Sequence, residues 1–127
     1  MKRFYLRELA HTRAGDKGDT NNIGVIAYEP HYYPIILRWV TPERVRAHFR
    51  GIVKGPITRY ELPRVHAVNL VLENALGGGV TRSLSIDPHG KSYSALILTM
   101  PVEVPDDVAV ELLEQGRTPL AADSSEP

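Results

Sequence analysis

The first third of the chain alternates between short apolar runs and polar connections. Residues 4–9 are partly alternating and contain aromatic side chains, which predicts an opening strand. Residues 11–22 are polar and include two glycines, so we expect a loop there. Residues 23–28 form a mostly apolar run that is typical of a buried strand. A turn over residues 30–34 then leads to residues 35–40, which fit either a short strand or the approach to a helix.

The middle of the chain predicts two helices separated by one strand. The first helix would begin after the N-cap Thr41 and end at the Gly-Pro pair of residues 55–56. Its apolar stripe comprises Val45, Phe49, Ile52 and Val53. Residues 57–62 carry the β-branched and aromatic side chains of a strand. The second helix would begin at Pro63 and end at Gly77. Its inward face would comprise Val65, Val68, Leu72 and Leu76.

The last third predicts a hairpin followed by a segment of different character. Residues 81–86 and 92–100 are typical of strands, and the Asp-Pro-His-Gly sequence at 87–90 favours a turn between them. Residues 106–115 fit a short helix, and we expect residues 118–127 to be disordered and dispensable for stability.

The order of these elements is strand, strand, helix, strand, helix, strand, strand. It predicts an α+β fold of the split βαβ type, a two-layer sandwich with two helices on one face of a mostly antiparallel sheet. We expect residues 1–104 to form this domain and residues 105–127 to be a C-terminal extension.

Composition narrows the function classes. The 15 basic and 15 acidic side chains of this 127-residue chain cancel, which disfavours a nucleic-acid binder. The absence of cysteine excludes disulfides, thiolate nucleophiles and cysteine-ligated metals. The N-terminus lacks the apolar run of a signal peptide, and no stretch approaches the ~20 apolar residues that span a bilayer. We therefore expect a cytoplasmic protein that associates with neither nucleic acid nor membranes.

Residues 13–19 are the first candidate for chemistry. Their glycines could turn backbone N–H groups toward an anion, with Arg13 and Lys17 adding positive charge. Asp16 and Asp19 could orient those cations, hold Mg²⁺ or act as a general base. An ordinary solvated turn explains the same residues. The candidate catalytic residues are Asp16, Lys17 and Asp19.

Further candidates are polar residues that could contact a ligand. The five histidines share no metal-ligand spacing. Only His11, which lies beside the charged segment at residues 13–19, is kept as a candidate ligand-binding residue. The three consecutive glycines at residues 77–79 could let a phosphate or carboxylate approach the backbone closely, although a helix C-cap also explains them. Asn69 lies on the apolar face of the second predicted helix, so we expect it to be buried with its amide hydrogen-bonded. Its partner could be a neighbouring strand or loop, or a ligand. The ligand-binding candidates are His11, Arg13, Asn22, Asn69, Gly78, Gly79 and Arg82; no residue is assigned to a metal.

Several of these segments also resemble a known family. Residues 9–25 read LAHTRAGDKGDTNNIGV, similar to the LAHARSGDKGDxxNIGV signature of AtuA-like domains. Residues 59–63 with Asn69, residues 75–84 and the turn at 87–92 are similar to that family too. The resemblance covers about residues 3–104, and the departures, Thr12 and Ala14, are mild. The chain resembles the C-terminal ferredoxin-like domain of the acyclic terpene utilisation protein AtuA, standing alone.

This resemblance implies a ferredoxin-like fold and a catabolic setting. Such domains occur fused to a larger N-terminal domain or as a small chain beside such a partner, in the breakdown of acyclic terpenes and other branched acids as coenzyme A thioesters. The resemblance supplies no reaction. It implies a larger AtuA-type partner protein, with a coenzyme A thioester as a candidate substrate and no assigned cofactor, and it leaves a homo-oligomer open.

Three functions remain at this point. The first is an accessory subunit that completes a site with the larger partner. The second is a self-contained lyase or hydratase with Asp16 or Asp19 as general base and Lys17 or Arg82 against a carboxylate or enolate. The third is a ligand-sensing regulatory domain, which rests on fold analogy. In each case we expect residues 13–19 and 77–82 to converge on one surface.

Overall fold

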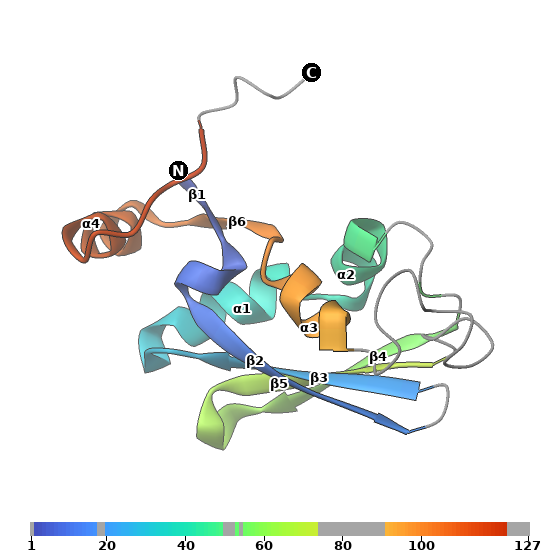
Figure 1. Ribbon diagram of the computed structural model, residues 1–127. Helices are drawn as coiled ribbons and strands as arrows, with labels where there is room; N and C mark the ends of the chain where they lie inside the picture. Colours follow the sequence, from blue (N-terminus) through green and yellow to red (C-terminus); the bar gives the residue numbers. More distant parts are fainter. Residues whose placement is uncertain (1, 18–19, 50–52, 54, 74–90, 122–127) are drawn as a thin grey trace.

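The computed structural model describes residues 2–17, 20–49, 53, 55–73 and 91–121. It confirms the predicted α+β class. The strands are β1 (Lys2–Tyr5), β2 (Ala10–Lys17), β3 (Thr20–Ala27), β4 (Ile57–Leu62), β5 (Ala67–Leu72) and β6 (Pro101–Val104). The helices are α1 (Tyr33–Trp39), α2 (Pro42–Phe49), α3 (Lys91–Ile97) and α4 (Asp106–Glu114), with 3-10 turns η1 (Leu6–Glu8), η2 (Pro30–Tyr32) and η3 (Pro63–Val65). Helices α1, α2 and α3 lie on one face of the larger sheet (Figure 1).

The larger sheet is a four-stranded antiparallel sheet in the order β2-β3-β5-β4. Because β3 and β4 are each antiparallel to β5, they run parallel to one another with β5 between them. Helices α1 and α2 connect β3 to β4, so these elements form the split βαβ unit that the element order predicts. Strand β2 adds to the free side of β3 as a hairpin.

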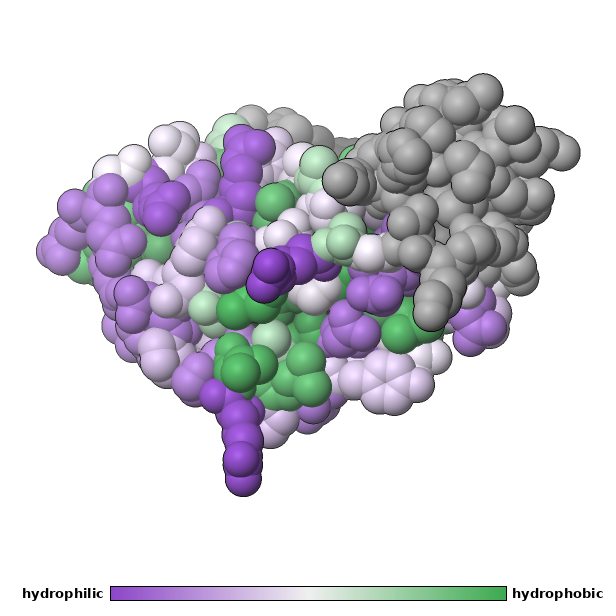
Figure 2. Space-filling model, turned by 60° about the horizontal axis from the view of Figure 1, so that its bottom comes forward, coloured by the Kyte–Doolittle hydropathy of each residue, from purple (hydrophilic) through white to green (hydrophobic). Residues whose placement is uncertain are grey.

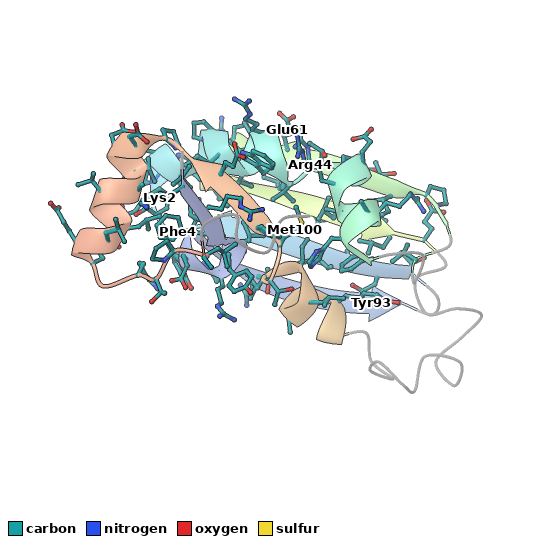
Figure 3. The ribbon with its side chains drawn as sticks, turned by 90° about the horizontal axis from the view of Figure 1, so that it is seen from above. Lys2, Phe4, Arg44, Glu61, Tyr93 and Met100 are labelled. Carbon is teal, nitrogen blue, oxygen red and sulfur yellow. The ribbon has the colours of Figure 1, made fainter. Side chains whose placement is uncertain are left out.

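The core lies between the helices and the inner face of this sheet. Alternate strand residues point inward and are fully buried, among them Ile23 and Val25 of β3. The other fully buried inward residues include Val68, Leu70 and Leu72 of β5, Ile36 of α1, Val45 of α2, and Tyr93 and Ile97 of α3. Helix α3 lies over β2 (Figure 3). Thr12 of β2 donates a hydrogen bond to the Ser94 carbonyl of α3 at 3.2 Å. The opposite, outer face of the sheet has no covering layer in the part of the chain that the structure describes.

Arg59 of β4 fixes the C-terminal end of α1. Its Nη1 donates to the carbonyl oxygens of Leu37 at 2.7 Å and Val40 at 2.9 Å. Helix ends leave such carbonyls without intrahelical partners, so this side chain satisfies groups that would otherwise be orphaned. Tyr33 ties the same helix to β5, because its hydroxyl donates to the Ala67 carbonyl at 3.0 Å.

The C-terminal extension shares the core of the domain. Strand β6 pairs with β1. Helix α4 follows β6 directly, where a short helix was expected at residues 106–115. Val108, Ala109 and Leu112 of α4 are buried in the same hydrophobic cluster as the sheet residues. After α4 the chain returns along β1, where the backbone N–H of Leu120 donates to the Arg3 carbonyl at 2.8 Å. Residues 118–121 are therefore attached to the fold, contrary to the expectation of a disordered segment.

The predicted loop at residues 11–22 is wrong, because residues 11–17 belong to β2 and residues 20–22 belong to β3, which pairs with it. Its polar side chains had suggested a loop. They occur because β2 is an edge strand with one face toward solvent, so His11 and Arg13 are exposed while Ala10 is buried.

The second predicted helix is also wrong. Pro63 begins the three-residue turn η3, and residues 67–72 are strand β5. Val65, Val68 and Leu72 fit a helical stripe, but Val68, Leu70 and Leu72 also alternate with period two. The burial of that alternate set between β3 and the helices decides for the strand.

The predicted strand at residues 92–100 is mostly helix α3. Tyr93, Ile97 and Met100 are buried at intervals of four and three residues, which is the spacing of one helix face. Strand β6 follows this helix at Pro101–Val104, a segment that was not predicted to be a strand. The strand expected at 81–86, the turn at 87–90 and the end of the predicted first helix at 50–52 fall outside the described residues.

Two shorter segments are resolved differently from their patterns. The opening strand expected at residues 4–9 ends at Tyr5 and gives way to η1. The turn expected at residues 30–34 is η2 leading into α1. Residues 35–39 lie within α1 itself, so the segment expected to be a short strand or the approach to a helix is the helix.

Candidate functional site

The outer face of the sheet carries three cross-strand rows of side chains. Directly opposed residues of neighbouring antiparallel strands share a face, so the register defines each row. The first row is His11, Ile26, Ala67 and Leu62. The second is Arg13, Gly24, Asn69 and Tyr60, and the third is Gly15, Asn22, Val71 and Thr58. Figure 2 shows this face with apolar residues gathered in its middle and polar residues around them.

Gly24 forms the floor of a hollow in this face. A Cβ at this position would lie 3.8 Å from the Arg13 carbonyl oxygen, 3.8 Å from Ile26 Cδ1 and 3.9 Å from Asn69 Oδ1. These are ordinary contact distances, so a methyl group would fit in the space that the glycine leaves. A glycine inside a strand weakens it and often marks a close approach of another molecule.

The outer-face hollow has a volume of about 310 Å³ and is open to solvent on one side. It is lined by Arg13, Ala14, Gly15, Asn22, Gly24, Ile26, Leu62, Val65, Ala67 and Asn69. Leu62 and Val65 are exposed apolar side chains at the β4–β5 turn and form its apolar wall.

Three polar side chains of the hollow are available to a ligand. Arg13 and Asn22 are exposed and Asn69 is partly buried. Within the described residues, none of these three side chains makes a hydrogen bond or an ion pair. Arg13 is the one charged residue of the lining, so the hollow favours an anion. Guanidinium binds carboxylate strongly and often with two hydrogen bonds, and the amides can add donors.

The arrangement could hold a small anion with an apolar body. Arg13, Asn22 and Asn69 would contact the anionic group from β2, β3 and β5, while Ile26, Leu62 and Val65 would contact the apolar part. Binding sites of this kind combine mostly apolar lining with a few polar groups that fix orientation.

Comparison with known proteins decides the family. The model of the AtuA ferredoxin-like domain family matches residues 4–103. The chain belongs to this family. No curated protein and no solved structure matches it. The match begins in β1 and ends in β6, so the whole outer face of this AtuA ferredoxin-like domain lies within the matched region, whereas α4 lies beyond it.

Four of the ligand-binding candidates from the sequence meet on the outer face of the AtuA ferredoxin-like domain. Arg13, Asn22 and Asn69 line the hollow, and His11 lies in the neighbouring row, stacked on Tyr28 with 5.3 Å between ring centroids. The expectation that Asn69 is buried with its amide satisfied is wrong. Because Asn69 lies on a strand, alternation places it on the outer face, opposite Gly24.

The remaining candidates are placed only in part. The backbones of Asp16 and Lys17 end β2, opposite Asn21 and Thr20. Asp19, Gly78, Gly79 and Arg82 lie outside the described residues. The expected convergence of residues 13–19 with residues 77–82 therefore stays a prediction.

Sequence reasoning missed Gly24, Leu62 and Val65 as lining residues. Alternation along residues 10–15 was the available signal, since it puts His11, Arg13 and Gly15 on one face once the segment is recognised as a strand. The other lining residues follow only from the strand order, which sequence pattern does not give.

A second polar cluster joins η2 to α4, away from the outer face of the domain. Glu111 accepts hydrogen bonds from His31 Nε2 at 2.8 Å and from the Tyr32 hydroxyl at 2.9 Å. These two hydrogen bonds lower the pKa of Glu111 below its usual value. Burial, and then the hydrogen bond to Glu111, raise the pKa of Tyr32 to about 12. This cluster attaches α4 to the body of the domain.

Two features are absent from the described part of the chain. No group of three His, Asp or Glu residues there is arranged to hold a metal ion. None of the described helices is long and apolar enough to cross a membrane.

Proposed function

We propose that this domain is an accessory subunit that completes a binding site with a larger AtuA-type partner protein. The combined site would bind branched or terpenoid carboxylic acids, or their coenzyme A thioesters, during their breakdown in the cytoplasm. The observation that carries the proposal is the outer-face hollow, in which Arg13, Asn22 and Asn69 adjoin an apolar wall.

The shape of the hollow favours a site shared with another protein. Small-molecule sites usually bury roughly 70–90% of the ligand surface. The hollow lies on an open sheet face and leaves one side of a bound molecule in solvent. A second protein seated over this face would supply the missing wall.

The lining residues favour binding over independent catalysis. None of the ten is Asp, Glu, His or Lys, the residue types that most often transfer protons in active sites. The chemical groups of the reaction would then come from the partner. A lyase or hydratase activity of the chain alone would instead depend on Asp16 or Asp19, and the experiment below separates the two functions.

The test combines the purified chain with the AtuA-type protein encoded in the same genome. We expect a stable complex that binds a branched acid such as 3-methylbutanoate, or its coenzyme A thioester, more tightly than either protein alone. Arg13→Gln should weaken binding by the complex at least about tenfold, equal to about 1.4 kcal/mol. Isothermal titration measures both effects.

A matched control is Arg38→Gln, because Arg38 is also an exposed arginine but lies on α1, on the helical side of the sheet. This variant should bind as the wild type does. Turnover of the thioester by the chain alone, abolished by Asp16→Asn or Asp19→Asn, would instead establish the lyase or hydratase. Equal binding by the Arg13→Gln and wild-type complexes would refute the assignment of the hollow.

A further inference from the structure

Strand β4 is an edge of the four-stranded sheet. It pairs with β5 on one side, and no segment that the structure describes pairs with its other side. An edge strand presents N–H and C=O groups that can pair with another strand. Natural edges are commonly protected by proline or by charged side chains. Strand β4 reads Ile-Thr-Arg-Tyr-Glu-Leu; it contains no proline, and its two charges, Arg59 and Glu61, are opposite in sign, so they can attract a complementary strand. Tyr60 and Leu62 are 55% and 43% exposed along it.

The charges of β4 select a second copy of the same strand as its partner. A two-fold axis perpendicular to the sheet pairs two β4 strands antiparallel and keeps the same face of each sheet on the same side. Such an axis lies midway between one residue of β4 and the same residue of the second copy. An axis at Arg59 would place Arg59 opposite its own copy, and an axis at Glu61 would do the same for Glu61. Like charges directly opposed across strands are destabilising.

An axis at Tyr60 removes both conflicts. Arg59 then lies opposite Glu61 of the second copy, and Glu61 lies opposite its Arg59, so two cross-strand ion pairs form. Within one copy Arg59 already contacts Glu61, with Nη2 and Oε2 separated by 3.0 Å. The four side chains would form one alternating set on the inner face. Glu61 lies at the margin of the molecule beside this edge (Figure 3) and its side chain is 53% exposed, so it can reach a second copy.

The same axis joins apolar groups on the outer face. The two Tyr60 side chains would meet on the axis, and each Leu62 would lie opposite Thr58 of the other copy. The two sheets would become continuous, with both outer-face hollows on one surface.

We propose that this domain forms a two-fold symmetric dimer by antiparallel pairing of β4 with β4 of a second copy, centred on Tyr60. Six residues a side bury less than the ~800 Å² per partner of a standard stable interface. The dimer should therefore be in equilibrium with the monomer, and the fraction of dimer should increase with protein concentration.

Sedimentation velocity of the wild-type chain over a wide concentration range tests the association. Glu61→Lys converts both ion pairs into like-charge pairs and should weaken dimerisation at least about tenfold. Tyr60→Lys and Tyr60→Glu should each weaken it similarly, because the two new charges would face one another on the axis. An equimolar mixture of these two variants should recover association as a heterodimer.

The control is Val110→Lys, which places the same charge at an exposed apolar position on α4 and should leave the dimer intact. Circular dichroism and melting curves check that each variant is folded. A wild type that stays monomeric at every concentration overturns the proposal. So does a mixture of Tyr60→Lys and Tyr60→Glu that associates no better than either variant alone. Neither result depends on the ligand or on the larger partner, so this inference and the proposed function can fail separately.

Discussion

Substituting Gly24 should stabilise the fold while removing the function of the outer-face hollow. An added Cβ meets its nearest neighbours at 3.8–3.9 Å, which is ordinary contact rather than a clash. Gly24 does not have a positive φ, so an L-residue fits its backbone. Alanine in place of a strand-interior glycine typically contributes about 0.5–1 kcal/mol of stability. For a domain of this size we expect Gly24→Ala to raise Tm by about 2–6 °C.

The same methyl group occupies the floor between Arg13 and Asn69. A ligand that contacts both side chains would be displaced outward, so its affinity should fall. Gly24→Val adds two more carbons and should reduce binding of the branched acid at least about tenfold, equal to about 1.4 kcal/mol. Differential scanning calorimetry gives the change in stability, and isothermal titration of the complex gives the change in affinity.

Thr58→Ile is the control for apolar bulk added elsewhere on the same face. Thr58 lies in a strand on the same outer face but does not line the hollow. It should leave ligand affinity unchanged. Two outcomes would refute the reasoning: Gly24→Ala destabilising the domain by more than about 1 kcal/mol, which exceeds ordinary surface effects, or Gly24→Val binding as tightly as the wild type.

Three further predictions concern the C-terminal part of the domain. Tyr32→Phe removes the hydrogen bond to Glu111 and should cost about 1 kcal/mol at neutral pH. Because the pKa of Glu111 is lowered in the fold, this stabilisation is present above its unfolded pKa and lost as pH falls through the folded pKa. Urea unfolding of both proteins should therefore show a smaller difference at acid pH, and a constant difference would contradict the ionised Glu111. Leu112→Ala should cost about 2–5 kcal/mol by urea unfolding, since Leu112 is fully buried; a cost below that range would place α4 outside the core. Deleting residues 122–127 should cost less than about 0.5 kcal/mol, whereas deleting residues 118–127 also removes the hydrogen bond to β1 and should cost about 1 kcal/mol more; equal melting temperatures would show that this attachment is not stabilising.

The class of the fold could be predicted from the sequence, but several of its elements could not. Pro42 and the spacing of Val45 and Phe49 locate α2 correctly, because a first-turn proline and a helical stripe agree. Residues 65–72 gave the wrong element, since their apolar positions satisfy the helical and the strand period together. Only pairing with β3 and β4 distinguishes them, and pairing is a long-range property.

Sequence reasoning identified several residues of the candidate site but not the surface that they form together. His11, Arg13, Asn22 and Asn69 were all identified from the sequence, but Asn69 was assigned to a buried helical face. Its partners on the outer face come from strands that lie far apart in the chain. The strand order β2-β3-β5-β4 brings them together, and no local pattern encodes that order.

The outer face and the inner face of the sheet are under different constraints, and this difference supports the assignment of the site. Inner-face residues such as Ile23, Val25 and Leu70 are fully buried, so their side chains are fixed by packing. Gly24 and Asn69 alternate with them along the same strands but belong to the outer face, where Gly24 leaves space and Asn69 is only partly buried. A glycine in a strand interior and an amide without a partner are both locally unfavourable choices for a sheet surface. Exceptions to local rules are expected where function requires them. These two exceptions oppose each other directly in the register, beside an arginine without a partner among the described residues, and together the three residues support the proposal that a ligand binds at the outer-face hollow.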